Sequence, residues 1–248
     1  MGSKQASALA VLVFPAVLAL PAASGAGADS PRGQTAAAPV VHQMVVFRSG
    51  AAVGRKVRAR GVSARVGRKR CAVGGATALA ALVRSRPGAL GLMDYASCSR
   101  RARDAGGIYV RSIGKDRARG PNGWIYKVGH KQATAGGGDP SGPFGRGRLR
   151  GGQRVTWFYC LYRRGCQRTL ALRPRSLGGG LLAVRVRGYD DAGRGIAVGG
   201  ATVSADGRVA TTDASGNAQL RVSPGRHLVR ASKAGLVRSF GERVTVGP

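Results

Sequence analysis

Four cysteines are the residues of this 248-residue chain best suited to chemistry. Cysteine thiolates bind zinc, exchange disulfides or act as nucleophiles. Zinc sites use C-x2-4-C clusters or closely spaced histidines, and neither pattern occurs here. A C-x-x-C redox motif is also missing from the sequence. Cys71, Cys98, Cys160 and Cys166 are instead spaced by 27, 62 and 6 positions. The choice between metal ligands, a redox pair and structural disulfides therefore depends on the compartment in which the chain folds.

The N-terminal sequence predicts export. Lys4 precedes 13 uncharged, mostly aliphatic residues at positions 8–20, and small-x-small sequences typical of signal-peptidase cleavage follow. A membrane anchor is the alternative, but crossing a bilayer takes ~20 apolar residues and Pro15 interrupts this run. We therefore predict a signal peptide over residues 1–26, a flexible tail over 27–39, and no transmembrane span. The mature protein is expected to be secreted, or extracellular and associated with the cell envelope.

Export favours disulfides, because an oxidising compartment pairs an even number of cysteines. The six-residue spacing predicts a disulfide between Cys160 and Cys166 across a hairpin whose turn is 161–165. That assignment leaves Cys71 to pair with Cys98. Four cysteines allow three connectivities, and we predict this one.

The usual signatures of catalysis are weak. Asp190 and Asp191 are the only adjacent carboxylates, and they follow a strand pattern where aspartate supports a turn. Glu242 is the only glutamate, so little is left to form an acid–base pair. The glycine-rich segment 145–152 precedes a strand pattern, whereas a phosphate-binding loop precedes a helix. We expect no enzymatic activity, no cofactor and no metal.

The positive charge is large and unevenly distributed. The net charge is +31, and residues 40–175 hold 29 Lys or Arg against four acids, whereas residues 176–248 hold ten against five. For an exported protein this predicts anionic envelope polymers as partners and no specific nucleic acid. The candidate polymer-binding residues are Lys56, Arg58, Arg60, Arg68, Lys69, Arg70, Arg146, Arg148 and Arg150. The alternative is that 34 arginines against 7 lysines reflect codon bias and make a soluble surface without a site.

Hydrophobic patterns predict a mainly β protein with one short helix. Period-two alternation indicates strands within 40–47, 53–67, 106–114 and 123–134. Residues 78–84 favour a helix capped by Thr77. We expect 153–160 and 167–174 to form the disulfide-linked hairpin. The predicted boundaries are a first domain over 40–173, a linker over 174–180, and a second domain over 181–248 that folds alone.

Three aromatic residues are candidates for contact with a ligand. Trp124 and Tyr126 alternate along one predicted strand, and Trp157 lies in another whose two faces are both apolar. Aromatic side chains dominate the cores of small β domains, so burial in the core is one interpretation. The other is a platform for a flat ligand beside the glycine-rich segment.

These motifs resemble a bacterial domain of unknown function related to the C-terminal β-domain of transcobalamin and intrinsic factor. The resemblance covers about residues 53–172. It rests on Gly123, Trp124, Tyr126, Val128, Leu149, Gly152, Val155, Trp157 and Tyr159. It implies a β-grasp-like sheet. In the vertebrate relatives the domain closes over a corrinoid beside a large α-helical domain, and no such helical segment is found in this sequence.

The C-terminal segment resembles a carboxypeptidase regulatory-like, prealbumin-like module. Residues 181–248 alternate strand patterns with turn signals such as Asp206-Gly207 and Ser215-Gly216 at sandwich spacing. The resemblance implies an Ig-like β-sandwich that serves as a non-catalytic spacer or adhesive unit. Two functions remain open: an envelope protein that binds anionic polymers, and a soluble, corrinoid-like small-molecule binder. A flat basic face would favour the first, and a concave aromatic pocket near Trp124 would favour the second.

Overall fold

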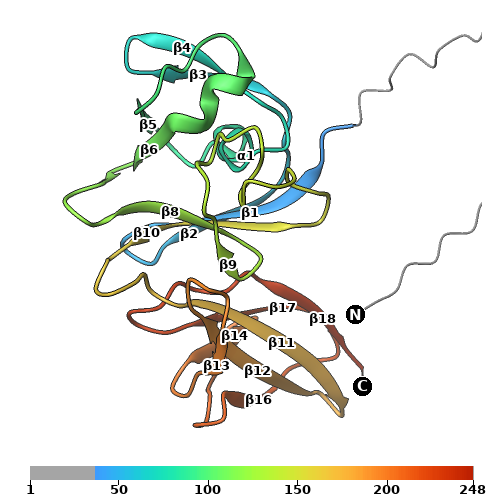
Figure 1. Ribbon diagram of the computed structural model, residues 1–248. Helices are drawn as coiled ribbons and strands as arrows, with labels where there is room; N and C mark the ends of the chain where they lie inside the picture. Colours follow the sequence, from blue (N-terminus) through green and yellow to red (C-terminus); the bar gives the residue numbers. More distant parts are fainter. Residues whose placement is uncertain (1–36, 248) are drawn as a thin grey trace, which may run out of the picture. The chain divides into compact units, whose positions relative to one another are not determined.

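The computed structural model describes residues 37–247. The predicted signal peptide and most of the predicted tail, residues 27–39, lie outside this range. Residues 37–247 lie within one compact unit. Strands account for most of its ordered structure, as the sequence predicts, with one α-helix and one short 3-10 helix (Figure 1). In the part of the chain that is described, no helix is long and apolar enough to cross a bilayer.

The first domain is built on a five-stranded sheet in the order β2-β1-β10-β8-β9. Its strands are β1 (Val40–Val46), β2 (Ala52–Arg58), β8 (Gly123–Val128), β9 (Lys131–Gln132) and β10 (Arg154–Cys160). β1 and β2 form an N-terminal hairpin, and β10 lies parallel to β1 at the centre of the sheet. An N-terminal hairpin, a helix and a returning strand parallel to the first make the β-grasp arrangement that we predicted.

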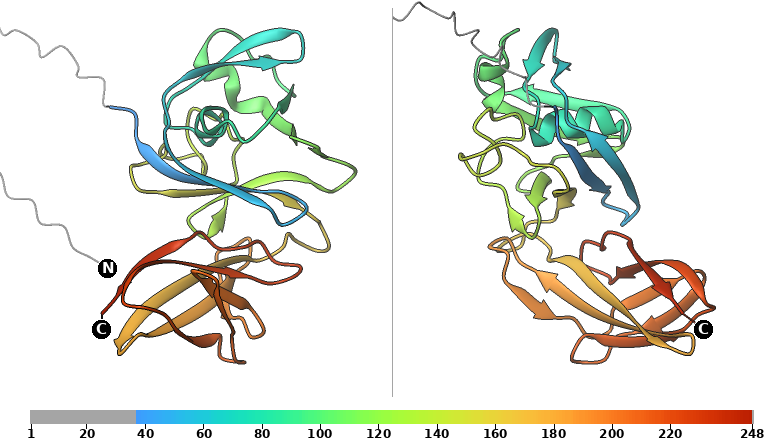
Figure 2. Two further views of the ribbon diagram at one scale, coloured as in Figure 1. Left: turned by 180° about the vertical axis from the view of Figure 1, so that it is seen from behind. Right: turned by 90° about the vertical axis from the view of Figure 1, so that its right-hand side faces the viewer.

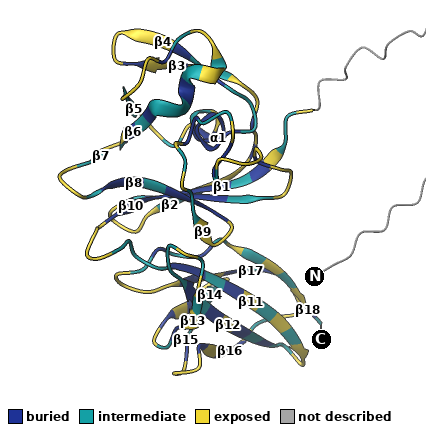
Figure 3. Ribbon diagram, viewed as in Figure 1, coloured by how far each residue is buried: buried dark blue, intermediate teal, exposed yellow. Residues whose placement is uncertain are grey.

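The helix α1 (Ala78–Ser85) packs on one face of this sheet. Thr77 caps it, since its hydroxyl accepts a hydrogen bond from the Ala80 amide at 3.2 Å. Leu79 and Leu82 are fully buried, and Gln43 of β1 donates to the Ser85 hydroxyl at 2.7 Å. Figure 3 shows this burial along α1 and the central strands. The predicted cap and helix are thus confirmed.

Smaller elements complete the first domain. A hairpin is formed by β3 (Val62–Val66) and β4 (Lys69–Val73), and a three-stranded sheet by β5 (Leu90–Asp94), β6 (Ile108–Ile113) and β7 (Asp116–Arg117). The 3-10 helix η1 spans Ala102–Gly107. The single strand predicted over 53–67 is wrong, because the chain leaves the main sheet after Arg58. Gly61 and Gly75 come so close there that a Cβ on Gly75 would lie 3.2 Å from the Gly61 nitrogen.

The second domain is a sandwich of two antiparallel sheets (Figure 2). One sheet contains β11 (Thr169–Gly178), β12 (Leu181–Tyr189), β13 (Gly195–Ala197) and β16 (Asn217–Arg221). The other contains β14 (Thr202–Ala205), β15 (Arg208–Thr211), β17 (Gly225–Ser232) and β18 (Glu242–Val246). Leu182, Val184, Val203 and Val229 are among the side chains that fill the core between them. This is the sandwich that the turn spacing predicted.

The domain boundary differs from our prediction. Residues 167–174 do not pair with β10, whose neighbours are β1 and β8. They belong to β11, which pairs with β12 from Thr169 to Gly178 and contributes Leu170 and Leu172 to the second core. Residues 174–178 are therefore strand and not linker, and the connection between the domains is the short segment 161–168. Alternation alone shows that a segment is a strand but not which neighbour it pairs with.

Candidate functional site

The three candidate aromatic residues come from the neighbouring strands β8 and β10. Trp157 lies opposite Tyr126 and Tyr159 opposite Trp124 in the antiparallel register. The rings of Tyr126 and Trp157 stack, with centroids 4.7 Å apart and planes inclined by 25°. All three candidates are at most 6% exposed, so they belong to the core of the first domain. β10 is covered on both sides, because Phe158 faces a second apolar cluster.

The same aromatic residues line a concave cavity of about 340 Å³. Trp124, Tyr126 and Trp157 line it together with Ile108, Tyr109 and Val110 of β6 and with the glycine backbone at 106–107 and 136–137. Tyr95 also lines it and is 73% exposed, which places an aromatic ring at the solvent edge. Its ring lies 6.0 Å from that of Tyr109. Trp124, Tyr126 and Trp157 are therefore core residues of the first domain that also line the cavity.

Close backbone approaches explain why glycine is abundant beside the cavity. A Cβ on Gly136 would lie 2.2 Å from the Gly106 carbonyl oxygen. A Cβ on Gly137 would lie 2.8 Å from Cη2 of Trp157. Larger residues would push the 135–138 segment away from β10 and the 3-10 helix. Residues 135–137 therefore form a wall of the cavity.

The polar atoms around the cavity differ in whether they have partners. The Tyr126 hydroxyl donates to the Ala135 carbonyl at 2.9 Å, and burial raises the pKa of this phenol. Trp124 Nε1 donates to the Asp116 carbonyl at 2.9 Å. In contrast, Trp157 Nε1 and Gln132 Oε1 are buried without a hydrogen-bond partner. The cavity lining thus includes one residue with a spare buried donor and one with a spare buried acceptor, and a buried polar group without a partner is costly.

The candidate polymer-binding residues are all exposed but lie on three separate segments. Lys56 and Arg58 are on β2 with Arg60 just beyond, Arg68, Lys69 and Arg70 are in the β3–β4 hairpin, and Arg146, Arg148 and Arg150 precede β10. Lys69 pairs with Asp94 at 2.8 Å, and this contact is the main reason that the pKa of Asp94 is lowered. Of the nine residues, Lys56 lines a cleft near the second domain. The sequence selected the other eight residues for their charge, and the structure shows that they are exposed.

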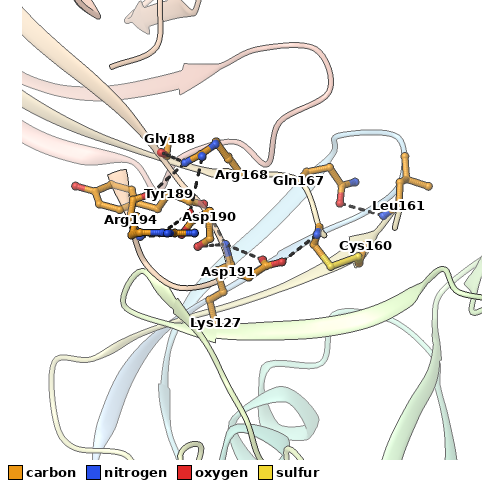
Figure 4. Close-up of polar contacts among 11 residues, drawn as sticks. Lys127, Cys160, Leu161, Gln167, Arg168, Gly188, Tyr189, Asp190, Asp191 and Arg194 are labelled. Carbon is orange, nitrogen blue, oxygen red and sulfur yellow. Dashed lines mark hydrogen bonds and ion pairs between the residues drawn. A yellow bond between two sulfur atoms is a disulfide. The ribbon is translucent and has the colours of Figure 1, made fainter. Parts of the chain in front are cut away.

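A buried lysine that the sequence did not single out links the two domains (Figure 4). The side chain of Lys127 on β8 is 0% exposed. Its Nζ donates to the carbonyls of Tyr189 at 3.1 Å and Asp190 at 2.8 Å and lies 3.3 Å from Asp191 Oδ1. Burial lowers the pKa of Lys127, and the Asp191 carboxylate opposes that shift. Its only sequence signal is a lysine inside an aromatic strand.

Asp190 and Asp191 both have structural roles, because each carboxylate accepts a hydrogen bond from a backbone amide. Asp190 accepts from the Arg194 amide at 2.8 Å in the predicted turn, and this contact is the main cause of its lowered pKa. Asp191 accepts from the Cys166 amide at 3.0 Å, which ties the lysine network to a disulfide. Both disulfides join the predicted partners, Cys71 with Cys98 and Cys160 with Cys166. Within residues 37–247 no group of three or more His, Cys, Asp or Glu side chains is placed to hold a metal.

Comparisons with protein-family models, curated proteins and solved structures find no match. The two family resemblances therefore rest on the quoted motifs and stay predictions. The mainly β fold with one short α-helix stands on the structure itself.

Proposed function

We propose that this protein is an exported, non-enzymatic binding protein whose first domain holds a small planar ligand in the aromatic cavity. The observation that carries the proposal is a concave aromatic cavity lined by two residues with unpartnered buried polar atoms, Trp157 Nε1 and Gln132 Oε1. Apolar cavities with a few convergent polar groups are the usual form of small-molecule sites. Two disulfides are compatible with an extracellular location.

The cavity defines the chemistry of its ligand. A volume of about 340 Å³ is near the lower end of ligand pockets, so a compound of one or two rings fits and a whole corrinoid is too large. The aromatic side chains of the lining favour a flat ring. The ligand should be neutral, because no charged side chain lines the cavity. Trp157 Nε1 and Gln132 Oε1 have almost no accessible surface, so binding must shift these side chains and expose the N–H to an acceptor, and the carbonyl to a donor, on the ligand.

Calorimetric titration with 2-quinolone tests this proposal, since this flat lactam carries a donor and an acceptor on one edge. Trp157→Phe removes the indole donor, and Gln132→Leu removes the carbonyl acceptor. Each loss should weaken binding about tenfold, as expected for one hydrogen bond in a dry site. Naphthalene, which has the same shape without polar groups, should bind the wild type more weakly and should lose less affinity than 2-quinolone does in either variant.

Tyr159→Phe is the matched control. Its hydroxyl donates to the Arg117 carbonyl at 2.9 Å, and Tyr159 does not line the cavity. The Tyr159→Phe variant should bind 2-quinolone with the affinity of the wild type. Equal affinity of the wild type and both cavity variants for 2-quinolone, or loss of affinity in the control alone, would refute the assignment.

A further inference from the structure

Two clefts lined with arginines lie where the first and second domains meet. The first, of about 610 Å³, lies between β1–β2 on one side and β17 with residues 238–243 on the other. The second, of about 620 Å³, lies between Arg154 of β10 and strands β11 and β12. Arg243 lines both clefts and is the residue that they share. Neither cleft shares a residue with the aromatic cavity.

The first cleft is positively charged and has no carboxylate in its lining. Its cations are Arg55, Lys56, Arg230, Arg238 and Arg243. None of the five takes part in an ion pair among the residues that the structure describes. His42 also lines this cleft, and its pKa is lowered by burial and then by Lys56, Arg154 and Arg243. Five unpaired cations around one cleft repel each other, and an external anion would relieve that repulsion.

The second cleft continues this charge. Arg154, Arg173, Arg185 and Arg187 line it, together with the shared Arg243. Its one carboxylate, Glu242, is already engaged by Arg154 in a two-pronged pair whose Nη2–Oε2 distance is 2.7 Å. The two clefts together hold nine cations and one neutralised acid. Guanidinium groups suit phosphate in particular, because their planar fork gives two parallel hydrogen bonds.

The aromatic side chains of these clefts argue against nucleic acid as the occupant. Single-stranded nucleic acid is held by stacking its bases on free aromatic faces. Here Phe240 lies under the Arg154 guanidinium, 5.2 Å from it, and Tyr189 stacks on His130 with 3.7 Å between ring centroids. The clefts therefore present positive charge to a ligand, whereas the rings of Phe240 and Tyr189 are already in contact with Arg154 and His130.

We propose that the two clefts form one continuous site for a linear polymer of phosphate groups without bases. Two clefts that share a lining arginine suit a chain with repeated charges better than a single small anion. The site differs from the one that the sequence predicted within residues 40–175. Five of its nine cations, Arg185, Arg187, Arg230, Arg238 and Arg243, lie beyond residue 175, and with Arg173 of β11 the second domain supplies six.

The test uses the full-length mature protein and long-chain inorganic polyphosphate, with affinity measured over a salt series. Arg230, Arg238 and Arg243 are replaced together by Gln. The matched control replaces Arg65, Arg68 and Arg70 by Gln, which removes the same charge from the exposed β3–β4 hairpin. The cleft variant should bind at least ~30-fold more weakly and show a shallower salt dependence, since phosphate contacts release counterions. The control should change affinity by less than ~3-fold.

Further variants and other anionic polymers distinguish binding in the clefts from misfolding and from unspecific binding to charge. Arg55→Gln with Lys56→Gln on the exposed edge strand β2 should weaken binding on its own, which guards against misfolding of the triple variant. Trp157→Phe should leave polyphosphate affinity unchanged. Poly(glycerol phosphate) should bind, whereas oligothymidylate of equal charge should bind more weakly. Equal loss in the cleft and hairpin variants would overturn the proposal, as would no binding of polyphosphate or tighter binding of oligothymidylate.

Discussion

Replacing Lys127 by Met should destabilise the junction of the two domains more than any exposed lysine change. Methionine keeps most of the length of the stem but removes the cation that contacts two carbonyls and the Asp191 carboxylate. Removing one partner of a buried ion pair costs roughly 3–5 kcal/mol. The cost here should be lower, about 2–4 kcal/mol, because Asp191 is 33% exposed and keeps its bond from the Cys166 amide.

The pH dependence of this effect has a definite sign. Burial lowers the pKa of Lys127 in the folded protein, whereas an unfolded lysine titrates near ~10.4. Between these two values the unfolded chain binds more protons, so the contribution of Lys127 to stability rises with pH. The Lys127→Met variant loses this rise. The gap in unfolding free energy between wild type and variant should therefore widen as pH increases toward ~10.

Urea unfolding followed by tryptophan fluorescence at pH 7, 8 and 9 measures both quantities. The control is Lys131→Met, because Lys131 lies on the next strand, β9, and is exposed. The Lys131→Met variant should change the unfolding free energy by less than ~1 kcal/mol, because it gives up only a cation–π contact with Phe144. A Lys127→Met variant as stable as the control, or a gap that narrows as pH rises, would refute the assigned role of this lysine.

Two further predictions concern the disulfides and the domain boundary. Serine substitution of the Cys71–Cys98 pair should lower the unfolding free energy by roughly 3.5 kcal/mol, and that of the Cys160–Cys166 pair by roughly 2 kcal/mol, because the disulfides close loops of 27 and 6 residues. Chemical unfolding measures both losses, and a larger loss for the shorter loop would contradict the loop argument. A fragment of residues 169–248 should unfold cooperatively on heating, whereas a fragment of residues 181–248 should not, because it lacks β11 at one edge of the sandwich. Cooperative unfolding of the shorter fragment would show that the second domain begins near residue 178.

Local chemistry was the part of the structure that could be predicted from the sequence. Thr77 followed by an apolar run predicted a helix and its cap, and both are present. The even cysteine count predicted the two disulfides that the structure shows. The apolar faces of 154–160 predicted a strand covered on both sides, as β10 is. The helix and the strand depend on neighbours in sequence, and the cysteine pairing followed from the even count once export was predicted.

Long-range partners were the part that could not be predicted. Strand alternation cannot show that β11 pairs with β12, because both partners satisfy the same pattern. Lys127 looked like one more surface cation until β8 was placed against the Asp190–Asp191 turn. The uneven charge placed anion binding in the first half of the chain. The structure shows that Arg230, Arg238 and Arg243 of the second half face Lys56 across one cleft.

The central claim is tested most directly by the indole N–H signals of the ¹⁵N-labelled protein. The chain has two tryptophans, so its spectrum holds two such signals, which Trp124→Phe and Trp157→Phe assign. Trp157 Nε1 has no partner, whereas Trp124 Nε1 already donates to the Asp116 carbonyl. On titration with 2-quinolone, the Trp157 signal should move downfield as it gains an acceptor, by clearly more than the Trp124 signal. A larger movement of the Trp124 signal, or none in either at millimolar 2-quinolone, would contradict the proposed site.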